Sequence, residues 1–194
     1  IYFDSINAIS YINNNFVAVG SNNNNENANS VYIPNSVTSM GNGVFFACSS
    51  LNSVTLPDGI TSIGESVFSC CRALISLDIP PSVTSIGKAA FNECDALTSI
   101  IIPENVTSIG KWAFEVCSNL SSVTIGSGMK SIGEEAFGYC WKLKKVYCYA
   151  TEPPTCDNNA FEDPSNTGAT LYVPLRCAAK YKATRTWGNY FKNI

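Results

Sequence analysis

Hydrophobic and polar positions alternate along this chain in a unit that returns every 23 residues. Each unit contains the pattern Leu-x-x-φ-x-φ, in which φ is an aliphatic residue, as in LNSVTL at 51–56 and LSSVTI at 120–125. Alternation with a period of two predicts a strand with one buried face, so we expect Val54 and Leu56 to point inward and the residues beside them outward. Four kinds of residue keep the 23-residue step through five copies: Gly41, Gly64, Gly87, Gly110 and Gly133; Phe45, Phe68, Phe91, Phe114 and Phe137; Cys48, Cys71, Cys94, Cys117 and Cys140; Leu51, Leu74, Leu97, Leu120 and Leu143.

The rest of each unit predicts a turn, a second strand and one further short element. Pro57, Pro80 and Pro103 follow the first strand and end it. The sequence VTSIG, or a close variant, predicts a second extended stretch, and we expect its glycine to adopt a backbone conformation closed to other residues. The sequence KAAFNEC at 88–94 predicts one helical turn with its Ala and Phe packed inward. Since one such coil cannot bury its apolar face alone, the copies are expected to stack into a solenoid.

The repeated phrase is specific enough to indicate a family. In five units over residues 31–145 the chain carries IP-x-x-VTSIG-x-x-AF-x-x-C-x-x-L-x-x-φ-x-φ, which resembles the repeat of the BspA-type leucine-rich-repeat family. The sequence ISYINNNFVAVG at 9–20 resembles the lead-in strands of that family, and residues 149–194 resemble its closing segment. The resemblance implies a leucine-rich-repeat solenoid of the α/β class, with mostly short parallel strands, one helical turn per coil, and a cap at each end. It also implies a surface or secreted protein of anaerobic gut or oral bacteria.

We expect one domain over residues 1–194. Its parts are an N-terminal cap with an Asn-rich loop at 1–30, five 23-residue repeats at 31–145, a degenerate coil at 146–174 and a C-terminal cap at 175–194. In the degenerate coil Phe161 follows Phe137 by 24 residues, so one residue is inserted. Four aromatic residues of the last segment are expected to close the open end: Tyr181, Trp187, Tyr190 and Phe191. Because solenoids need caps to stay soluble, the capped chain is expected to be a monomer.

Composition and charge exclude several classes of function. Charged residues make up 14% of the chain and the net charge is −3, so the chain lacks the basic face that nucleic-acid binding needs. Charge is uneven, with 3 basic and 9 acidic residues at 1–129 and 9 basic and 6 acidic residues at 130–194. The absence of histidine removes Ser-His-Asp triads, Cys-His dyads and most catalytic zinc sites. We therefore predict no enzymatic activity, no catalytic residue, no metal site and no cofactor.

The start of the chain and its hydropathy bear on localisation. No apolar run approaches the ~20 residues that a membrane-spanning helix needs, so no membrane span is expected. The chain starts at Ile1 without Met, which we interpret as a mature or trimmed form. A signal peptide or lipid anchor would then already have been removed. We expect an exported protein, located at the cell surface or outside the cell.

The nine cysteines allow two interpretations. Disulfides are common in exported proteins. Five of the cysteines, however, follow the repeat and would stack at the ~4.7–4.9 Å spacing of neighbouring strands, whereas a disulfide brings its Cβ atoms to about 3.8 Å. Free cysteine behaves as a small hydrophobic residue. We therefore favour a buried structural ladder of thiols, with disulfides as the alternative; its members are Cys48, Cys71, Cys94, Cys117 and Cys140.

Leucine-rich solenoids usually bind ligands on the concave sheet, and the outward positions of the first strand define that face. The residues between the two inward positions are, in chain order, Tyr32, Thr55, Asp78, Ile101, Thr124, Tyr147 and Tyr172. Most of the face is small and hydroxyl-rich, but tyrosines collect near Lys144 and Lys145 at its C-terminal end. Tyrosines provide a large contact area at low entropic cost. The candidate ligand-binding residues are Tyr147, Tyr149, Tyr172, Lys145, Ile101 and Asp78. The alternative is that the tyrosines only cover the end of the sheet.

The repeat and the resemblance together predict a non-enzymatic, adhesin-like binding module. We expect it to bind host extracellular matrix proteins or bacterial surface proteins, or a glycan, through the concave sheet. The alternative is a structural spacer of the bacterial envelope with no dedicated ligand.

Overall fold

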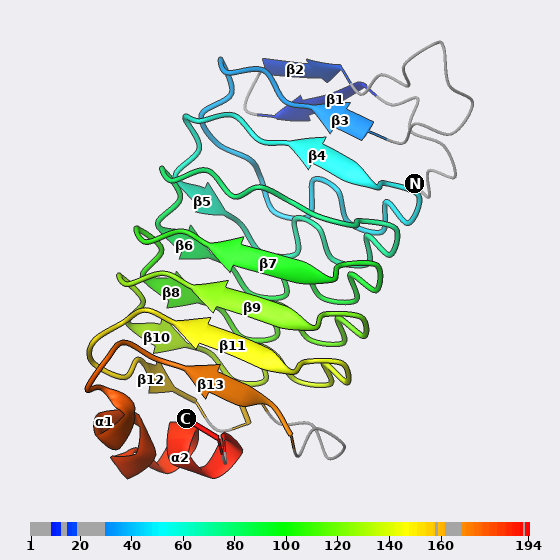
Figure 1. Ribbon diagram of the computed structural model, residues 1–194. Helices are drawn as coiled ribbons and strands as arrows, with labels where there is room; N and C mark the ends of the chain where they lie inside the picture. The colour runs from blue at the N-terminus through cyan, green and yellow to red at the C-terminus, as the bar shows by residue number, and fades with distance from the viewer. Residues whose placement is uncertain (1–8, 13–14, 19–29, 158, 162–167, 192) are drawn as a thin grey trace.

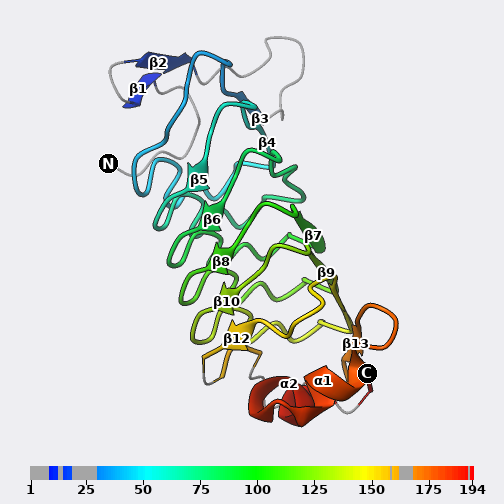
Figure 2. The same cartoon turned by 90° about the vertical axis from the view of Figure 1, so that its left-hand side faces the viewer.

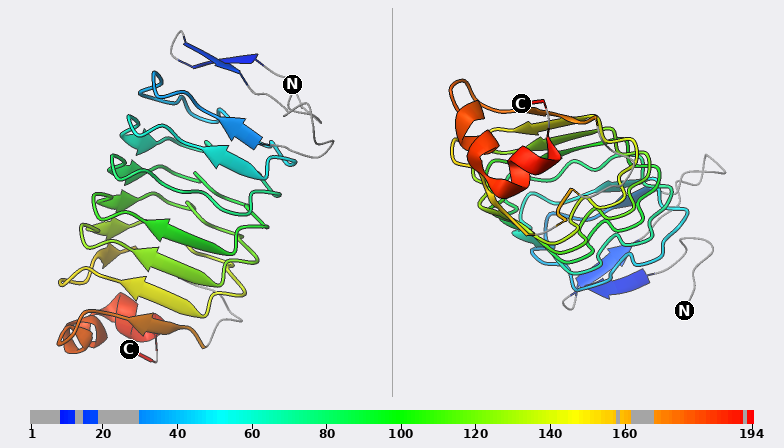
Figure 3. Two further views of the ribbon diagram at one scale, coloured as in Figure 1. Left: turned by 45° about the horizontal axis from the view of Figure 1, so that its top comes forward. Right: turned by 90° about the horizontal axis from the view of Figure 1, so that it is seen from below.

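The computed structural model describes residues 9–12, 15–18, 30–157, 159–161, 168–191 and 193–194. In this part of the chain about six coils stack into a parallel β-solenoid, as predicted (Figure 1). The coils follow one another in sequence order along the stack, with the blue N-terminal strands at one end and the red helices at the other (Figure 3). The Asn-rich loop expected before Val31 lies outside the described residues, apart from Ser30.

Two parallel sheets run along the stack and enclose the core between them. The five-stranded sheet consists of β5 (Ser62–Ile63), β6 (Ser85–Ile86), β8 (Ser108–Ile109), β10 (Ser131–Ile132) and β12 (Thr155–Cys156) (Figure 2). The four-stranded sheet consists of β7 (Ser99–Ile102), β9 (Ser122–Ile125), β11 (Lys145–Cys148) and β13 (Thr170–Tyr172). On the same side of the solenoid, β3 (Ser30–Tyr32) pairs with β4 (Ser53–Thr55). Neighbouring strands of the repeats pair at the 23-residue step, as Ser99 does with Ser122.

The core is a set of columns, each filled by the same residue of successive coils. The phenylalanine column shows this best, because the rings of Phe68, Phe91 and Phe114 stack with centroids 5.3 and 4.9 Å apart. Val54 and Leu56 are buried as predicted. Apolar burial of this kind stabilises a coil only when the next coil covers it, so the repeated phrase is an instruction for packing.

The predicted helical turn of each coil is wrong. Residues 88–94 form turns in which Ala89 and Glu93 have φ of 50° and 56°. Their N–H groups donate to the carbonyls of Lys111 and Glu115 in the next coil, both at 2.9 Å. A helix would direct its hydrogen bonds along its own axis, whereas here the stacked coil supplies the partners. These intercoil bonds hold non-glycine residues in the left-handed region, which is uncommon for them.

The repeated glycine also has a different role from the one expected. Among the described glycines only Gly43 has a positive φ, of 63°. A Cβ atom on Gly110 would instead lie 2.6 Å from the carbonyl carbon of Gly87 and 2.6 Å from the amide nitrogen of Lys88. Glycine is therefore needed at this position because the backbones of successive coils approach too closely for any side chain.

Replacing Gly110 by alanine tests this steric role. The new methyl group would press on backbone that cannot rotate away, so Gly110→Ala is expected to lower the free energy of unfolding by roughly 1–3 kcal/mol. Gly64→Ala is the matched control in the same column, because the nearest atom to its Cβ is the side-chain Oδ1 of Asn42 at 2.8 Å and its nearest backbone atom is 3.8 Å away. Urea unfolding of both variants measures the difference; equal losses would contradict the steric explanation.

The cysteine column is buried and makes hydrogen bonds between coils. All nine cysteines lie in the described residues, and none forms a disulfide. The thiol of Cys117 donates to the carbonyl of Phe91 at 3.1 Å, and Cys71, Cys94 and Cys140 repeat this bond in their own coils. Cys48, in the first of these coils, is only half-buried. The column thus combines a small apolar side chain with a weak donor for a core carbonyl.

The two ends of the solenoid carry different elements. At the N-terminal end β1 (Ile9–Ile12) and β2 (Asn15–Ala18) form an antiparallel hairpin. At the C-terminal end, where helical structure was predicted, α1 (Ala178–Ala183) and α2 (Arg185–Tyr190) lie across the last coil (Figure 1). The indole of Trp187 packs 5.3 Å from the ring of Phe161, the last member of the phenylalanine column. Trp187 and Tyr181 also donate hydrogen bonds of 2.8 Å to backbone carbonyls of the preceding coil.

Candidate functional site on the outer face of the strands

Three exposed tyrosines lie together at the C-terminal end of the four-stranded sheet. Tyr147 of β11 and Tyr172 of β13 are register partners, and their rings stack with centroids 4.6 Å apart and an interplanar angle of 16°. Tyr149 follows β11 on the same outward alternation and is 55% exposed. We call Tyr147, Tyr149 and Tyr172 the tyrosine platform. The rings are held by a paired sheet below them, so the platform is a preformed surface.

Positive charge borders the platform. Lys145 is the first residue of β11, and Lys144 precedes it; both side chains are exposed. Neither lysine forms a salt bridge within the described part of the chain. Their charges are thus available to carboxylates of a partner, which would aid association more than affinity.

Asp78 and Ile101 lie elsewhere on the same side of the solenoid, at an interruption in the strand pairing. Ser76–Ile79 lies between β4 and β7 in the stack but forms no strand, so the two sheets of this side remain separate. A pocket of about 220 Å³ opens here; we call it the slit, and it is lined by Ser76, Leu77, Asp78, Ile79, Ser99 and Ile101. Three coils separate Asp78 from Tyr147, roughly 14 Å at the usual strand spacing. The six predicted residues therefore form two sites and not one.

Proline accompanies the interruption on both of its sides. In later coils the strand end is closed by the N–H of Gly126, which donates to Ile102, and by that of Tyr149, which donates to Ile125, both at 3.0 Å. Pro80 and Pro103 occupy the equivalent positions and have no N–H to donate. Pro57 removes the same donor between β3 and β4, where the N–H of Ile33 donates to Thr55 at 3.1 Å and pairing persists.

A polar network on the turn side of the solenoid was not predicted. Trp112 lies between Lys88 and Lys111, whose Nζ atoms are 5.5 and 4.2 Å from the ring centroid. Its indole N–H donates to Glu135 at 2.9 Å. Burial raises the pKa of the nearby Glu115, and neighbouring carboxylates raise it further. Opposite charges placed 23 residues apart, as in Glu65 with Lys88, were the sequence signal for this network. Within the described ranges no three acidic or cysteine side chains are placed to hold a metal ion.

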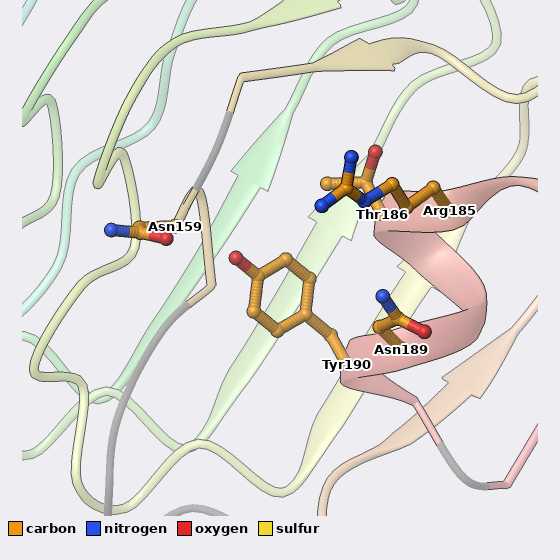
Figure 4. Close-up of a pocket in the computed structure, with 5 residues that line it drawn as sticks. All are labelled: Asn159, Arg185, Thr186, Asn189 and Tyr190. Atoms are coloured by element: carbon orange, nitrogen blue, oxygen red, sulfur yellow. The ribbon is translucent and has the colours of Figure 1, made fainter.

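A second pocket of about 220 Å³ lies under the C-terminal helices. Figure 4 shows Tyr190 pointing toward Asn159, with Arg185 and Asn189 on the neighbouring turns of α2. Thr186 completes the lining. The sequence analysis had placed Tyr190 in the cap and had not singled out the other four residues. The pocket is polar and contains no nucleophile beside a general base, so it offers no catalytic arrangement.

Comparison with known sequences decides the family. The sequence model of the BspA type leucine rich repeat region matches residues 20–144 in six copies, which is more than half of the chain. The chain belongs to this BspA-type family. The match begins before Val31 and contains one copy more than the five units counted from the residue columns. No match to the chain was found among curated proteins.

Solved structures of bacterial leucine-rich-repeat proteins are similar to this BspA-type chain. A leucine-rich-repeat protein of T. pallidum is 32% identical with a TM-score of 0.59, over 60% of this chain and 55% of that one. A leucine-rich-repeat protein of Bacteroides ovatus is 33% identical with a TM-score of 0.58, over 74% and 39% of the two chains. The pneumococcal vaccine antigen PcpA shares the fold at 21% identity and a TM-score of 0.66, over 87% and 40%. The chain thus spans about half or less of the length of these relatives.

The BspA-type repeat separates what the coils share from what distinguishes them. Residues common to the coils are buried, as Phe91 and Cys94 are. The platform and the slit are made by outward residues that differ from coil to coil, including Asp78, Ile101 and Tyr147. As for membranes, no helix in the described part of the chain is long and apolar enough to cross one.

Proposed function

We propose that this chain is a non-enzymatic binding module that recognises a protein through the tyrosine platform and Lys145. The stacked pair of Tyr147 and Tyr172 carries the proposal, because two aromatic rings fixed 4.6 Å apart on an open sheet face have no packing role in the core. Tyrosine is enriched among the residues that dominate binding energy at protein interfaces. A preformed pair also loses little conformational entropy when it is covered.

The partner class and location follow from the family. BspA-type proteins include many surface and secreted proteins, so the proposed partner is a host extracellular matrix protein or a protein on another bacterium. Export to the cell surface or the medium belongs to the same proposal. The absence of histidine from the chain supports a non-enzymatic role, since the hydroxyl groups of the sheet face have no general base beside them.

Capture of candidate partners tests the proposal. Purified matrix proteins and bacterial surface proteins and glycans are presented to the wild type, to the double variant Tyr147→Ala/Tyr172→Ala and to Trp141→Ala. Loss of two interface aromatics is expected to weaken capture of a protein by about 30-fold or more. Trp141 is the matched control, since it is 50% exposed but lies among the turns. Equal capture by the wild type and the double variant would rule out the platform.

A structural spacer is the second candidate. The solved relatives are longer than the part that this chain matches, with 55% and 39% of their lengths covered, so similar solenoids occur as parts of larger proteins. A spacer needs no ligand. Failure of the wild type to capture any protein or glycan in the panel would therefore favour this function.

A further inference from the structure

The slit contains polar groups that have no partner in the fold. Because Ser76–Ile79 is not paired with β4 or β7, its peptide groups lack the ladder hydrogen bonds that strands normally make. Ser76 and Ser99 add hydroxyl groups, and Asp78 adds a carboxylate to the lining. Asp78 forms no salt bridge in the described part of the chain. The slit is therefore rich in acceptors.

The surroundings of the slit are apolar and negatively charged. Ile101 is 68% exposed and lines one side of the slit. Asp58 and Glu104 follow the strand positions of the two flanking coils and are exposed. The two basic residues between positions 51 and 104 are Arg72 and Lys88, and they already pair with Glu93 and Glu65. No cation of this region is thus left to neutralise Asp78.

The interruption also opens the upper layer of the core. Leu77 and Ile79 are 5% and 8% exposed, whereas Val123 and Ile125 of the continuous sheet are both 0% exposed. A ligand entering the slit would therefore meet apolar surface at its base and hydrogen-bond acceptors at its rim. A side chain with an apolar stem and a flat, multiply donating, positively charged end matches both features.

We propose that the slit binds an arginine side chain presented by the protein partner. The guanidinium group carries five N–H donors in a planar fork, so it can donate to the Asp78 carboxylate and to the free carbonyls of Ser76–Ile79 together. Its methylene stem would cover Ile101. Lysine is a poorer match, because its ammonium group is compact and strongly hydrated. This inference rests on the proposed function, since the arginine belongs to the protein held on the same face.

A small probe tests the slit without the partner. Nα-acetylarginine amide is titrated into the labelled protein while backbone amide chemical shifts are followed, in parallel with the citrulline and lysine analogues. We expect shifts centred on 76–79, Ser99 and Ile101. The arginine probe is expected to bind at least about fivefold more tightly than the neutral citrulline probe, because its hydrogen bonds are charge-assisted, and more tightly than the lysine probe.

Two carboxylate variants complete the test. Asp78→Asn is expected to abolish the shifts and Asp58→Asn to retain them, with unchanged melting temperatures since both residues are exposed. Shifts outside the slit, equal binding of the three probes, binding that survives Asp78→Asn, or no binding would each overturn the inference. None of these outcomes bears on the platform, because Tyr147→Ala/Tyr172→Ala leaves the slit residues in place.

Discussion

Removal of residues 175–194 is expected to abolish the cooperative thermal unfolding of the solenoid and to produce an aggregating chain. The segment buries Trp187, Tyr181 and Phe191, which are 1%, 0% and 3% exposed. Without it Phe161 and the apolar edge of the last coil would face water, and an open solenoid end can stack on another copy. Calorimetry and light scattering measure both effects; a truncated chain that stays monomeric and melts cooperatively would contradict the capping role.

A point variant separates capping from simple loss of chain length. Trp187→Ala removes the largest side chain over Phe161 and the hydrogen bond of 2.8 Å to the carbonyl of Pro154, so it is expected to cost about 3–5 kcal/mol of unfolding free energy. Leu175→Ala is the control, because Leu175 lies in the same segment but is 90% exposed. Urea unfolding should show the loss in the first variant only. A similar loss in both would mean that the segment does not act through burial.

Alkaline pH is expected to destabilise the solenoid strongly. Burial raises the pKa of the Cys117 thiol from 9.0 to about 12, and burial also raises the pKa values of Cys71 and Cys94. The folded state therefore keeps these protons when the unfolded chain has released them. The stability they contribute is fully present below pH 9.0 and is lost as the pH rises from there through the folded pKa values. Each thiol contributes about 1.4 kcal/mol per pH unit, so the three together contribute about 4 kcal/mol per pH unit.

The slope against pH distinguishes this titration from other alkaline effects. Cys117→Ala is expected to lower stability at neutral pH through lost packing. Above pH 9.0 its stability should fall less steeply than that of the wild type, by about 1.4 kcal/mol per pH unit. Urea unfolding at a series of pH values gives both slopes. Parallel curves would show that the thiol ladder is not the origin of the alkaline loss.

Much of the fold could be predicted because each coil repeats the same burial pattern. Alternation with a period of two placed Val54 and Leu56 inward, and the structure agrees. The turns could not be predicted in this way, because Ala89 and Glu93 are ordinary helix-forming residues whose positive φ depends on hydrogen bonds to the next coil. The position of Gly110 was evident, but its cause is a contact with a residue 23 positions away.

The candidate site was predictable in its residues and less so in its arrangement. The repeat step alone brought Tyr147 beside Tyr172 once the insertion before Phe161 was counted. The slit was not foreseen, since SLDI at 76–79 fits the strand pattern as well as its neighbours do. Its unpaired state depends on two adjoining coils at once, each with proline at the strand end. Asp78 and Ile101 were thus identified from their chemistry, without the pocket that joins them.

The central claim is that binding energy comes from outward residues that differ between coils, and above all from the platform. Hydroxyl-radical footprinting of the chain with its captured partner tests this claim most directly, because exposed tyrosines elsewhere act as internal controls. We predict protection of Tyr147, Tyr149 and Tyr172, with Tyr139 and Trp141, which are 41% and 50% exposed, modified as in the free protein. Protection of Tyr139 and Trp141 with a fully reactive platform would contradict the account.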